Sequence, residues 1–139
     1  MAPIWRHVTR DVVGLDGSAP VRDAARLMAE HRIGSIAVLE GGRTVGLVTE
    51  RDLVLSVCAQ GADPGKPIRE VMRTGLPTVP VTATEVEVSG LMRDHVTRHL
   101  LVEKEGDVVG VISMRDVIQL MLDEKQYLIE QLETYIEGR

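Results

Sequence analysis

Two short stretches of the chain place a hydroxyl group three residues before a carboxylate. In GLVTERDL, residues 46–53, these are Thr49 and Asp52, and in GVISMRDV, residues 110–117, they are Ser113 and Asp116. Each stretch is typical of a strand that ends where a helix begins. A carboxylate there has acceptor oxygens for hydroxyl groups, and a helix N-terminus attracts anions. The spacing also fits a simple helix N-cap, so it predicts a cap, a ligand site or both.

The second stretch belongs to a repeat of the first. When residue n is aligned with residue n + 64, positions 18–53 match positions 82–117 without a gap, and ten of the 36 pairs are identical. Background frequencies would give roughly two or three identities. A copy of about sixty residues buries little core alone. We therefore expect two copies of one unit that pack face to face and share a core.

Hydrophobic periodicity predicts a strand, a helix, two strands and a helix in each copy. In the first copy the expected strands are 11–15, 36–39 and 44–49. The expected helices are one that begins at Pro20 and is stopped by Gly34, and one over 52–59. In the second copy the expected strands are 77–80, 100–102 and 108–113, and the expected helices are 85–95 and one from 116 onward. The segment 61–67 is the expected linker, because it is rich in glycine and proline.

Composition disfavours several classes of function. The 139 residues are only 2% aromatic and carry a net charge of −5, so nucleic-acid binding is not expected. The single Cys58 excludes an internal disulfide and a multi-cysteine metal site. Residues 1–20 lack an apolar signal-peptide core, and no apolar run is long enough to span a bilayer. We expect a cytoplasmic protein without a membrane partner.

The repeated pattern Met…His…(I/L)xV…GG/EG…VG(L/V)(V/I)(T/S)xRD resembles the tandem cystathionine-β-synthase (CBS) domain pair, also called a Bateman module. The resemblance covers residues 7 to about 122. It implies an α/β (α+β) fold, with two pseudo-symmetric β-α-β-β-α motifs packed sheet to sheet and a long C-terminal helix. The expected boundaries are 1–67 for the first motif with its linker, 68–122 for the second and 123–139 for a helical extension.

The resemblance also implies that the chain binds an adenine nucleotide, which could be AMP, ADP, ATP, NAD(H) or S-adenosylmethionine. In such pairs each motif aspartate accepts hydrogen bonds from the ribose hydroxyls, and apolar residues line the adenine pocket. The start of one copy contributes to the site that the aspartate of the other copy closes. The matching positions are Thr9, Val13, Ile33, Gly34, Leu47, Thr49, Asp52, Pro77, Thr97, Arg98, Val111, Ser113, Arg115 and Asp116. No catalytic residue, catalytic cofactor or metal is expected.

Two positions break the symmetry of these sites. Arg98 aligns with Gly34, and in the family a basic residue there often reaches the phosphates of the ligand; a solvated arginine is the alternative. Thr9 keeps the threonine that often follows a methionine in the family, whereas Arg73 replaces it in the second copy. We therefore expect two unequal sites. The arginines inside the motifs face either phosphate or solvent: Arg51 and Arg115.

Other polar residues indicate packing. His31 and His95 stand in the last turn of the first helix of each copy, where a hydrogen-bonding side chain suits the helix C-terminus better than a metal role. Cys58 follows the apolar residues Val54 and Leu55 and is expected to fill a core.

A long helix is expected over 117–137. Apolar residues at 118, 121, 128, 132 and 135 follow a near-heptad pattern that Lys125 interrupts. With Tyr127 and Ile136, they form a stripe that should be buried somewhere. A homodimer through this helix is the first hypothesis, and a tail folded back on its own module is the second.

Three functions are compatible with these residues. The first is a regulatory module that senses adenine nucleotides and passes a change of homodimer shape to an unidentified protein partner. The second, an enzyme, is disfavoured because no nucleophile–base pair or metal-ligand spacing is present. The third is a structural dimerisation scaffold with degenerate, empty nucleotide sites. Substitution of Asp52 and Asp116 separates the first from the third, because only a sensor would lose nucleotide binding.

Overall fold

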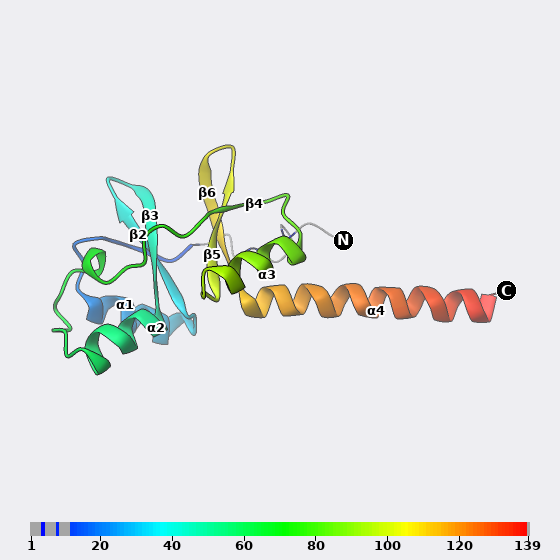
Figure 1. The fold of residues 1–139 in the computed structure, drawn as a ribbon, viewed down its shortest axis with the longest axis horizontal. Coiled ribbons are helices and arrows are strands. Elements are labelled where there is room, and N and C mark those ends of the chain that lie inside the picture. Colours follow the sequence, from blue (N-terminus) through cyan, green and yellow to red (C-terminus); the bar gives the residue numbers. More distant parts are fainter. Residues whose placement is uncertain (1–3, 5–7, 9–11, 139) are drawn as a thin grey trace.

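Two three-stranded sheets, one for each copy of the repeat, form the centre of the fold (Figure 1). The computed structural model describes residues 4, 8 and 12–138. The first sheet contains β1 (Gly14–Asp16), β2 (Ser35–Glu40) and β3 (Arg43–Thr49) in that order, and the second contains β4 (Val79–Pro80), β5 (His99–Lys104) and β6 (Asp107–Ser113). In each sheet the first strand pairs parallel with the second, and the last two strands form an antiparallel hairpin.

The helices follow the predicted order. They are α1 (Val21–His31), α2 (Glu50–Leu53) with its π-helical continuation η2 (Val54–Ala59), a 3₁₀ turn η3 (Ile68–Glu70), α3 (Glu85–Asp94) and α4 (Met114–Gly138). Figure 1 shows both hairpins pointing upward, with α1 and α2 near the lower end of the first sheet and α3 beside β5. The two sheets meet where β3 contacts β5. The predicted mixed fold of two pseudo-symmetric motifs is therefore confirmed.

The backbone conformation of the two hairpins also repeats at a spacing of 64 residues. The hairpins have irregular register at the equivalent positions Val38/Leu39 and Val102/Glu103. Each hairpin turn has two successive residues with positive φ, at 41–42 and at 105–106. Two-residue turns of this kind match the right-handed twist of the paired strands.

The end of α1 differs from the prediction. Gly34 does not stop the helix; Arg32 does, in the left-handed conformation with φ 52°, and its N–H donates to the Met28 carbonyl. The equivalent Val96, after α3, has φ 50°. Non-glycine residues adopt this conformation at a modest energetic penalty. Its recurrence at the same place in both copies indicates that the following strand requires it.

The expected single shared core is wrong, because each copy has its own buried cluster. Val21, Ile36 and Val48 belong to the cluster of the first copy, and Val88, Leu100 and Ile112 to that of the second; their exposed fractions are 2% or less. Within each copy the helices pack on the hydrophobic face of their own sheet. The clefts lie between the two copies.

The copies nevertheless exchange residues: Val8 also lies in the cluster of the second copy, and Val71 and Met72 pack against that of the first. Ile68, at the start of the second copy, is fully buried in the first cluster, and its N–H donates to the Ala19 carbonyl at 2.8 Å. The equivalent Ile4, near the start of the first copy, is buried in the second cluster, and its N–H donates to the Ala83 carbonyl at 3.0 Å. Ile4 and Ile68, which are equivalent in the repeat, thus each pack into the cluster of the other copy.

The closing helix of the first copy contradicts the expected packing of Cys58. Cys58 is exposed, and Val54 and Leu55 are also exposed, whereas Ser56 is buried. The π-helical winding of η2 explains the difference, since it changes the number of residues per turn and rotates the side chains away from the α-helical pattern.

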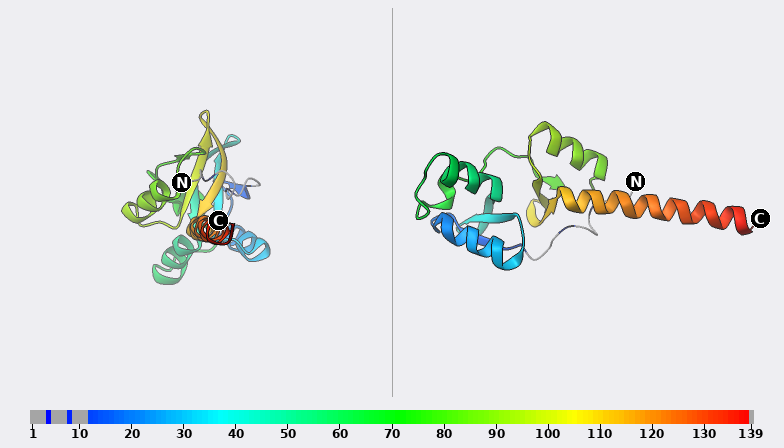
Figure 2. Two further views of the ribbon diagram at one scale, coloured as in Figure 1. Left: turned by 90° about the vertical axis from the view of Figure 1, so that its right-hand side faces the viewer. Right: turned by 90° about the horizontal axis from the view of Figure 1, so that it is seen from below.

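The tail is one continuous helix that projects away from the module. α4 begins at the β6 junction and runs to Gly138, and the right view in Figure 2 shows its C-terminal half standing clear of the other elements. The hypothesis that the tail folds back on its own module is therefore wrong. The exposed apolar stripe consists of Ile118, Met121, Leu122, Leu128, Ile129, Leu132, Tyr135 and Ile136. With 3.6 residues per turn, Tyr127 lies on the other side of the helix.

Candidate functional site

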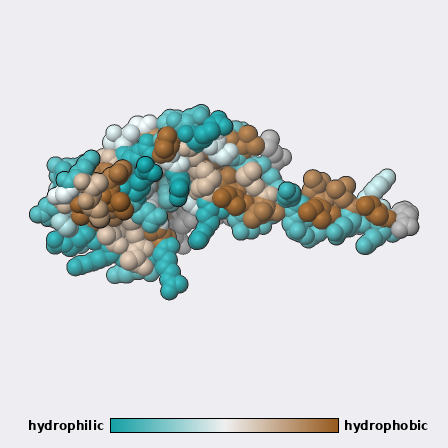
Figure 3. All heavy atoms as spheres, turned by 60° about the horizontal axis from the view of Figure 1, so that its bottom comes forward, coloured by the Kyte–Doolittle hydropathy of each residue, from teal (hydrophilic) through white to brown (hydrophobic). Residues whose placement is uncertain are grey.

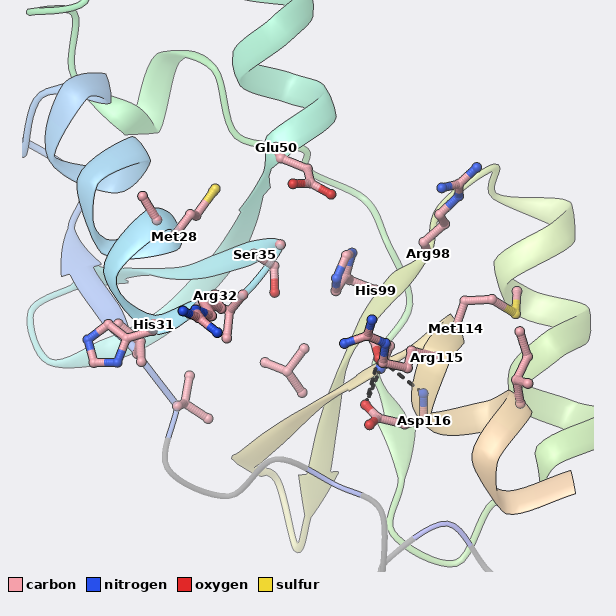
Figure 4. Close-up of a pocket in the computed structure, with 18 residues that line it drawn as sticks. Met28, His31, Arg32, Ser35, Glu50, Arg98, His99, Met114, Arg115 and Asp116 are labelled. Carbon is pink, nitrogen blue, oxygen red and sulfur yellow. Dashed lines mark hydrogen bonds between the residues drawn. The ribbon is translucent and has the colours of Figure 1, made fainter. Parts of the chain in front are cut away.

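Two clefts lie between the copies, and the larger one is closed by the Ser113–Asp116 junction (Figure 4). It has a volume of about 1080 Å³. One wall comes from the first copy, through Val12 and Val13 before β1 and through the turn between α1 and β2. The other wall comes from Val111 and the β6–α4 junction of the second copy. We call this space the first cleft.

The Ser113–Asp116 junction is a complete helix cap that leaves a carboxylate oxygen for other partners. The Ser113 backbone N–H and hydroxyl both donate to Oδ2 of Asp116, each at 2.8 Å, and the Asp116 N–H donates to the Ser113 hydroxyl at 3.2 Å. Within the described part of the chain, these contacts use only Oδ2. Capping and ligand binding are therefore compatible here, because Oδ1 remains an acceptor on the lining of the cleft.

The smaller space, called the second cleft, is closed by the equivalent junction of the first copy. Its volume is about 850 Å³. The Thr49 N–H and hydroxyl donate to Oδ2 of Asp52 at 2.8 and 3.0 Å, and the Asp52 N–H donates to the Thr49 hydroxyl at 3.3 Å. The two corners thus have the same geometry, as the sequence repeat requires.

The first cleft has both signs of charge on its rim. Arg32 comes from the end of α1, Arg98 from the start of β5 and Arg115 from the start of α4, and all three are exposed. Glu50 and Asp116 are the carboxylates (Figure 4). Guanidinium groups bind phosphate well, and a carboxylate accepts from hydroxyl groups. The lining therefore suits a ligand with an anionic end, a polyhydroxyl centre and an apolar part.

His99 forms a wall shared by both clefts. It lies in the centre of Figure 4, between the two copies, and lines each cleft together with Glu50 and Arg98. A Cβ atom at Gly34 would lie only 3.2 Å from a ring carbon of His99 and 3.3 Å from a Glu50 oxygen. Glycine at position 34 therefore lets the histidine and the glutamate approach the backbone of the first copy. Burial lowers the pKa of His99, although Glu50 and Asp116 act in the opposite direction.

The pKa of His99 predicts a pH dependence of stability. Because the fold disfavours the charged imidazole, the unfolded chain binds more protons below the ordinary pKa of 6.5, and the free energy of unfolding falls as the pH drops through that range. His99→Gln should remove this part of the slope, measured by urea unfolding between pH 7.5 and 5.5. His31→Gln, an exposed position, is the control. Equal slopes in His99→Gln and the unsubstituted chain would contradict the prediction.

The structure brings most of the predicted ligand positions to the two clefts. The first cleft contains Val13, Ile33, Gly34, Arg98, Val111, Ser113, Arg115 and Asp116. The second contains Thr49, Asp52, Thr97 and Arg98, together with Arg51. Leu47 and Pro77 do not line the second cleft; they border a separate hollow of about 120 Å³. Thr9 lies outside the described residues.

Sequence reasoning missed several residues that line the clefts. Glu50 lies inside the T-x-x-D motif, and His99 follows Arg98 directly, so both were adjacent to predicted positions. Met28 is buried in the core of the first copy and also borders the first cleft. The n + 64 alignment pairs Glu50 with Met114 and His99 with Ser35, so identity between the copies gave no signal for them.

The described residues contain neither a candidate metal centre nor a helix that could span a membrane. No group of three or more His, Cys, Asp or Glu side chains there could hold a metal ion. No helix among them is both long enough and apolar enough to cross a membrane. His95, one of the two recurrent histidines, contacts the Leu91 carbonyl through Nδ1 at 3.0 Å, as expected for a residue at a helix C-terminus.

Comparison with known proteins matches this architecture. The CBS domain model matches residues 5–58 and 68–123. The CBS domain-containing protein YhcV of Bacillus subtilis is 32% identical over 117 residues, which are 84% of this chain and 84% of that protein. A structure of an uncharacterized conserved protein from Pyrococcus horikoshii has a TM-score of 0.80 and 32% identity, over 86% of this chain and 92% of that one.

A further solved structure contains a nucleotide. It is a CBS domain protein from Pyrobaculum aerophilum complexed with AMP, with a TM-score of 0.74 and 30% identity, over 82% of this chain and 88% of that one. The doubled strand-to-helix corner, the pseudo-twofold arrangement of two sheets and the family match agree with one another. The chain therefore belongs to the CBS domain family and has two CBS domains in tandem.

Proposed function

We propose that this chain is a regulatory module that binds an adenine nucleotide in the first cleft. The observation that carries the proposal is the Asp116 corner, where the cap uses one carboxylate oxygen and the other remains available to a ribose. The apolar wall formed by Val13, Ile33 and Val111 suits an adenine ring, and the rim arginines suit phosphate. The similar Pyrobaculum aerophilum protein, solved with AMP, supports this class of ligand.

The role is binding rather than catalysis in this proposal. The polar groups of the first cleft can hold hydroxyls and phosphates, and the one hydroxyl–carboxylate contact among its described residues, between Ser113 and Asp116, is part of a helix cap. The output is then a ligand-dependent change in stability or in the surface that a protein partner contacts. His99 and Glu50, which line both clefts, would transmit the change between the two copies.

The proposal is tested by measuring the melting temperature of the chain with and without a large excess of each ligand. The ligands are AMP, ADP, ATP, NAD+, NADH and S-adenosylmethionine. A ligand at one hundred times its dissociation constant adds about 2.7 kcal/mol to the free energy of unfolding. This should raise the melting temperature of a chain of this size by several degrees. GMP is the control, because it has the same ribose and phosphate with a different base. No shift with any adenine ligand would favour a scaffold with empty sites.

The dimer through α4 is the second part of the proposal. The protruding part of α4 displays apolar patches in Figure 3, and Leu128 and Leu132 are 58% and 54% exposed. A near-heptad stripe is complementary to another copy of itself, so we infer that a second chain covers it. The resulting homodimer would place two modules at a fixed distance from each other.

Substitution in the stripe should separate the two chains. The double variant Leu128→Glu and Leu132→Glu introduces two carboxylates into the interface, so its mass by analytical ultracentrifugation should be that of one chain. Thr134→Glu adds a charge to the other side of the helix and should leave a dimer. A monomeric unsubstituted chain at micromolar concentration would contradict the dimer without affecting the nucleotide proposal.

A further inference from the structure

The two clefts should be alike, but they are not. Shifting Val12, Val13 and Val111 of the first cleft by one repeat gives Leu76, Pro77 and Leu47. The three valines and the Asp116 corner line one continuous space. Their three counterparts instead border a separate hollow of about 120 Å³ and do not line the space at the Asp52 corner. The apolar part of the second cleft is thus separated from its polar corner.

Arg73 lies at the boundary between these two spaces, because it lines both. Its backbone N–H donates to the Leu47 carbonyl on β3 at 3.1 Å. Its guanidinium reaches the end of α3, where Nη1 donates to the Val96 carbonyl and Nη2 donates to the His95 carbonyl, each at 2.8 Å. One residue therefore bridges the hairpin of the first copy and the helix of the second.

The position of the guanidinium is electrostatically favourable. The carbonyls of His95 and Val96 follow the last turn of α3, and the C-terminal end of a helix carries partial negative charge. Hydrogen bonds from an ionised donor are stronger than neutral ones. Burial of Arg73 is intermediate, so solvent does not fully compete for these bonds. A nucleotide that occupied the whole second cleft would have to break both bonds and displace the side chain.

We propose that Arg73 interrupts the second cleft, so that the chain binds one adenine nucleotide, in the first cleft only. The inference rests on the proposed function, since it assigns the nucleotide to one of two similar corners. The Asp52 corner then serves as a helix cap. Arg73 is a specificity-determining residue, which sets how many sites are open. At the aligned position in the first copy the chain has Thr9, a smaller side chain without charge.

Titration calorimetry of the full chain with AMP tests this assignment. The expected stoichiometry is one AMP per chain, abolished in Asp116→Ala and retained in Asp52→Ala. Arg73→Thr, which copies the residue at position 9, should raise the stoichiometry to two, and the added site should disappear in the double variant Arg73→Thr with Asp52→Ala. Arg93→Thr is the matched control, because Arg93 is an exposed arginine that lines the second cleft but not the separate hollow. It should bind one AMP.

The outcomes separate this inference from the proposed function. Two AMP per unsubstituted chain, or one AMP that is lost in Asp52→Ala, would overturn the role of Arg73 while supporting nucleotide binding. A stoichiometry of one in folded Arg73→Thr would also overturn it. No heat in any variant with AMP, and none with ADP, ATP, NAD+, NADH or S-adenosylmethionine, would overturn the proposed function itself. The unsubstituted chain and Asp52→Ala decide the question even if Arg73→Thr does not fold.

Discussion

Asp116→Ala should weaken AMP binding by at least about a hundredfold. In the proposed complex the carboxylate accepts from two ribose hydroxyls, and hydrogen bonds to a charged group contribute about 1.5–3 kcal/mol each. Because 1.4 kcal/mol corresponds to a factor of ten, losing both bonds gives about two orders of magnitude or more. Calorimetric titration of both proteins under the same conditions measures the ratio of dissociation constants.

The control for this substitution is in the same chain. Asp52→Ala removes the same kind of helix cap and should lower the free energy of unfolding by about 1 kcal/mol. It should leave the affinity for AMP unchanged. A second control changes the ligand, because 2′-deoxy-AMP lacks one of the two ribose hydroxyls. It should bind the unsubstituted chain more weakly than AMP does. On Asp116→Ala the two ligands should have the same affinity. An Asp116→Ala protein with unchanged AMP affinity would contradict the assignment of the ribose to this corner.

Ile68→Ala should lower the free energy of unfolding by about 2–5 kcal/mol. Ile68 is fully buried, yet it lies at the start of the second copy and packs into the cluster of the first copy. Its truncation removes apolar contacts and leaves a cavity that the surrounding strands and helix fill only in part. The predicted effect is large because this residue holds the start of the second copy against the first. Urea denaturation followed by circular dichroism measures the change.

Val86→Ala is the matched control for a small apolar truncation. Val86 is in α3 and is 57% exposed, so the change in stability should stay within about 0.5 kcal/mol. If Ile68→Ala were as mild as Val86→Ala, the exchange of segments between the copies would not contribute to folding. Ile4→Ala, the equivalent substitution in the other cluster, should resemble Ile68→Ala.

The repeat made much of the fold predictable, because its signals are local. Alternating and helical apolar patterns located the hairpins and α3 to within a few residues, and the T/S-x-x-D spacing located the starts of α2 and α4. The family resemblance supplied the pairing of one copy's start with the other copy's aspartate. Val13 and Asp116, 103 positions apart, do line one cleft.

Features that depend on contacts between the copies were not predictable from local pattern. The sequence shows that Arg73 replaces a threonine, but only the folded chain places its guanidinium on the carbonyls of His95 and Val96. The separate clusters and the exchange of Ile4 and Ile68 also depend on packing over long sequence distances. An apolar pattern assumes α-helical spacing, whereas η2 is π-helical, so the exposure of Cys58 was missed.

A crystal structure of the full chain grown with saturating AMP tests the central claim most directly. The account predicts one AMP in the first cleft, with its ribose hydroxyls on Oδ1 of Asp116 and its phosphate among the rim arginines. Arg73 should keep its contacts to the end of α3. A ribose bound at Asp52 in place of Asp116, or an unchanged first cleft with no nucleotide at saturating AMP, would contradict the account.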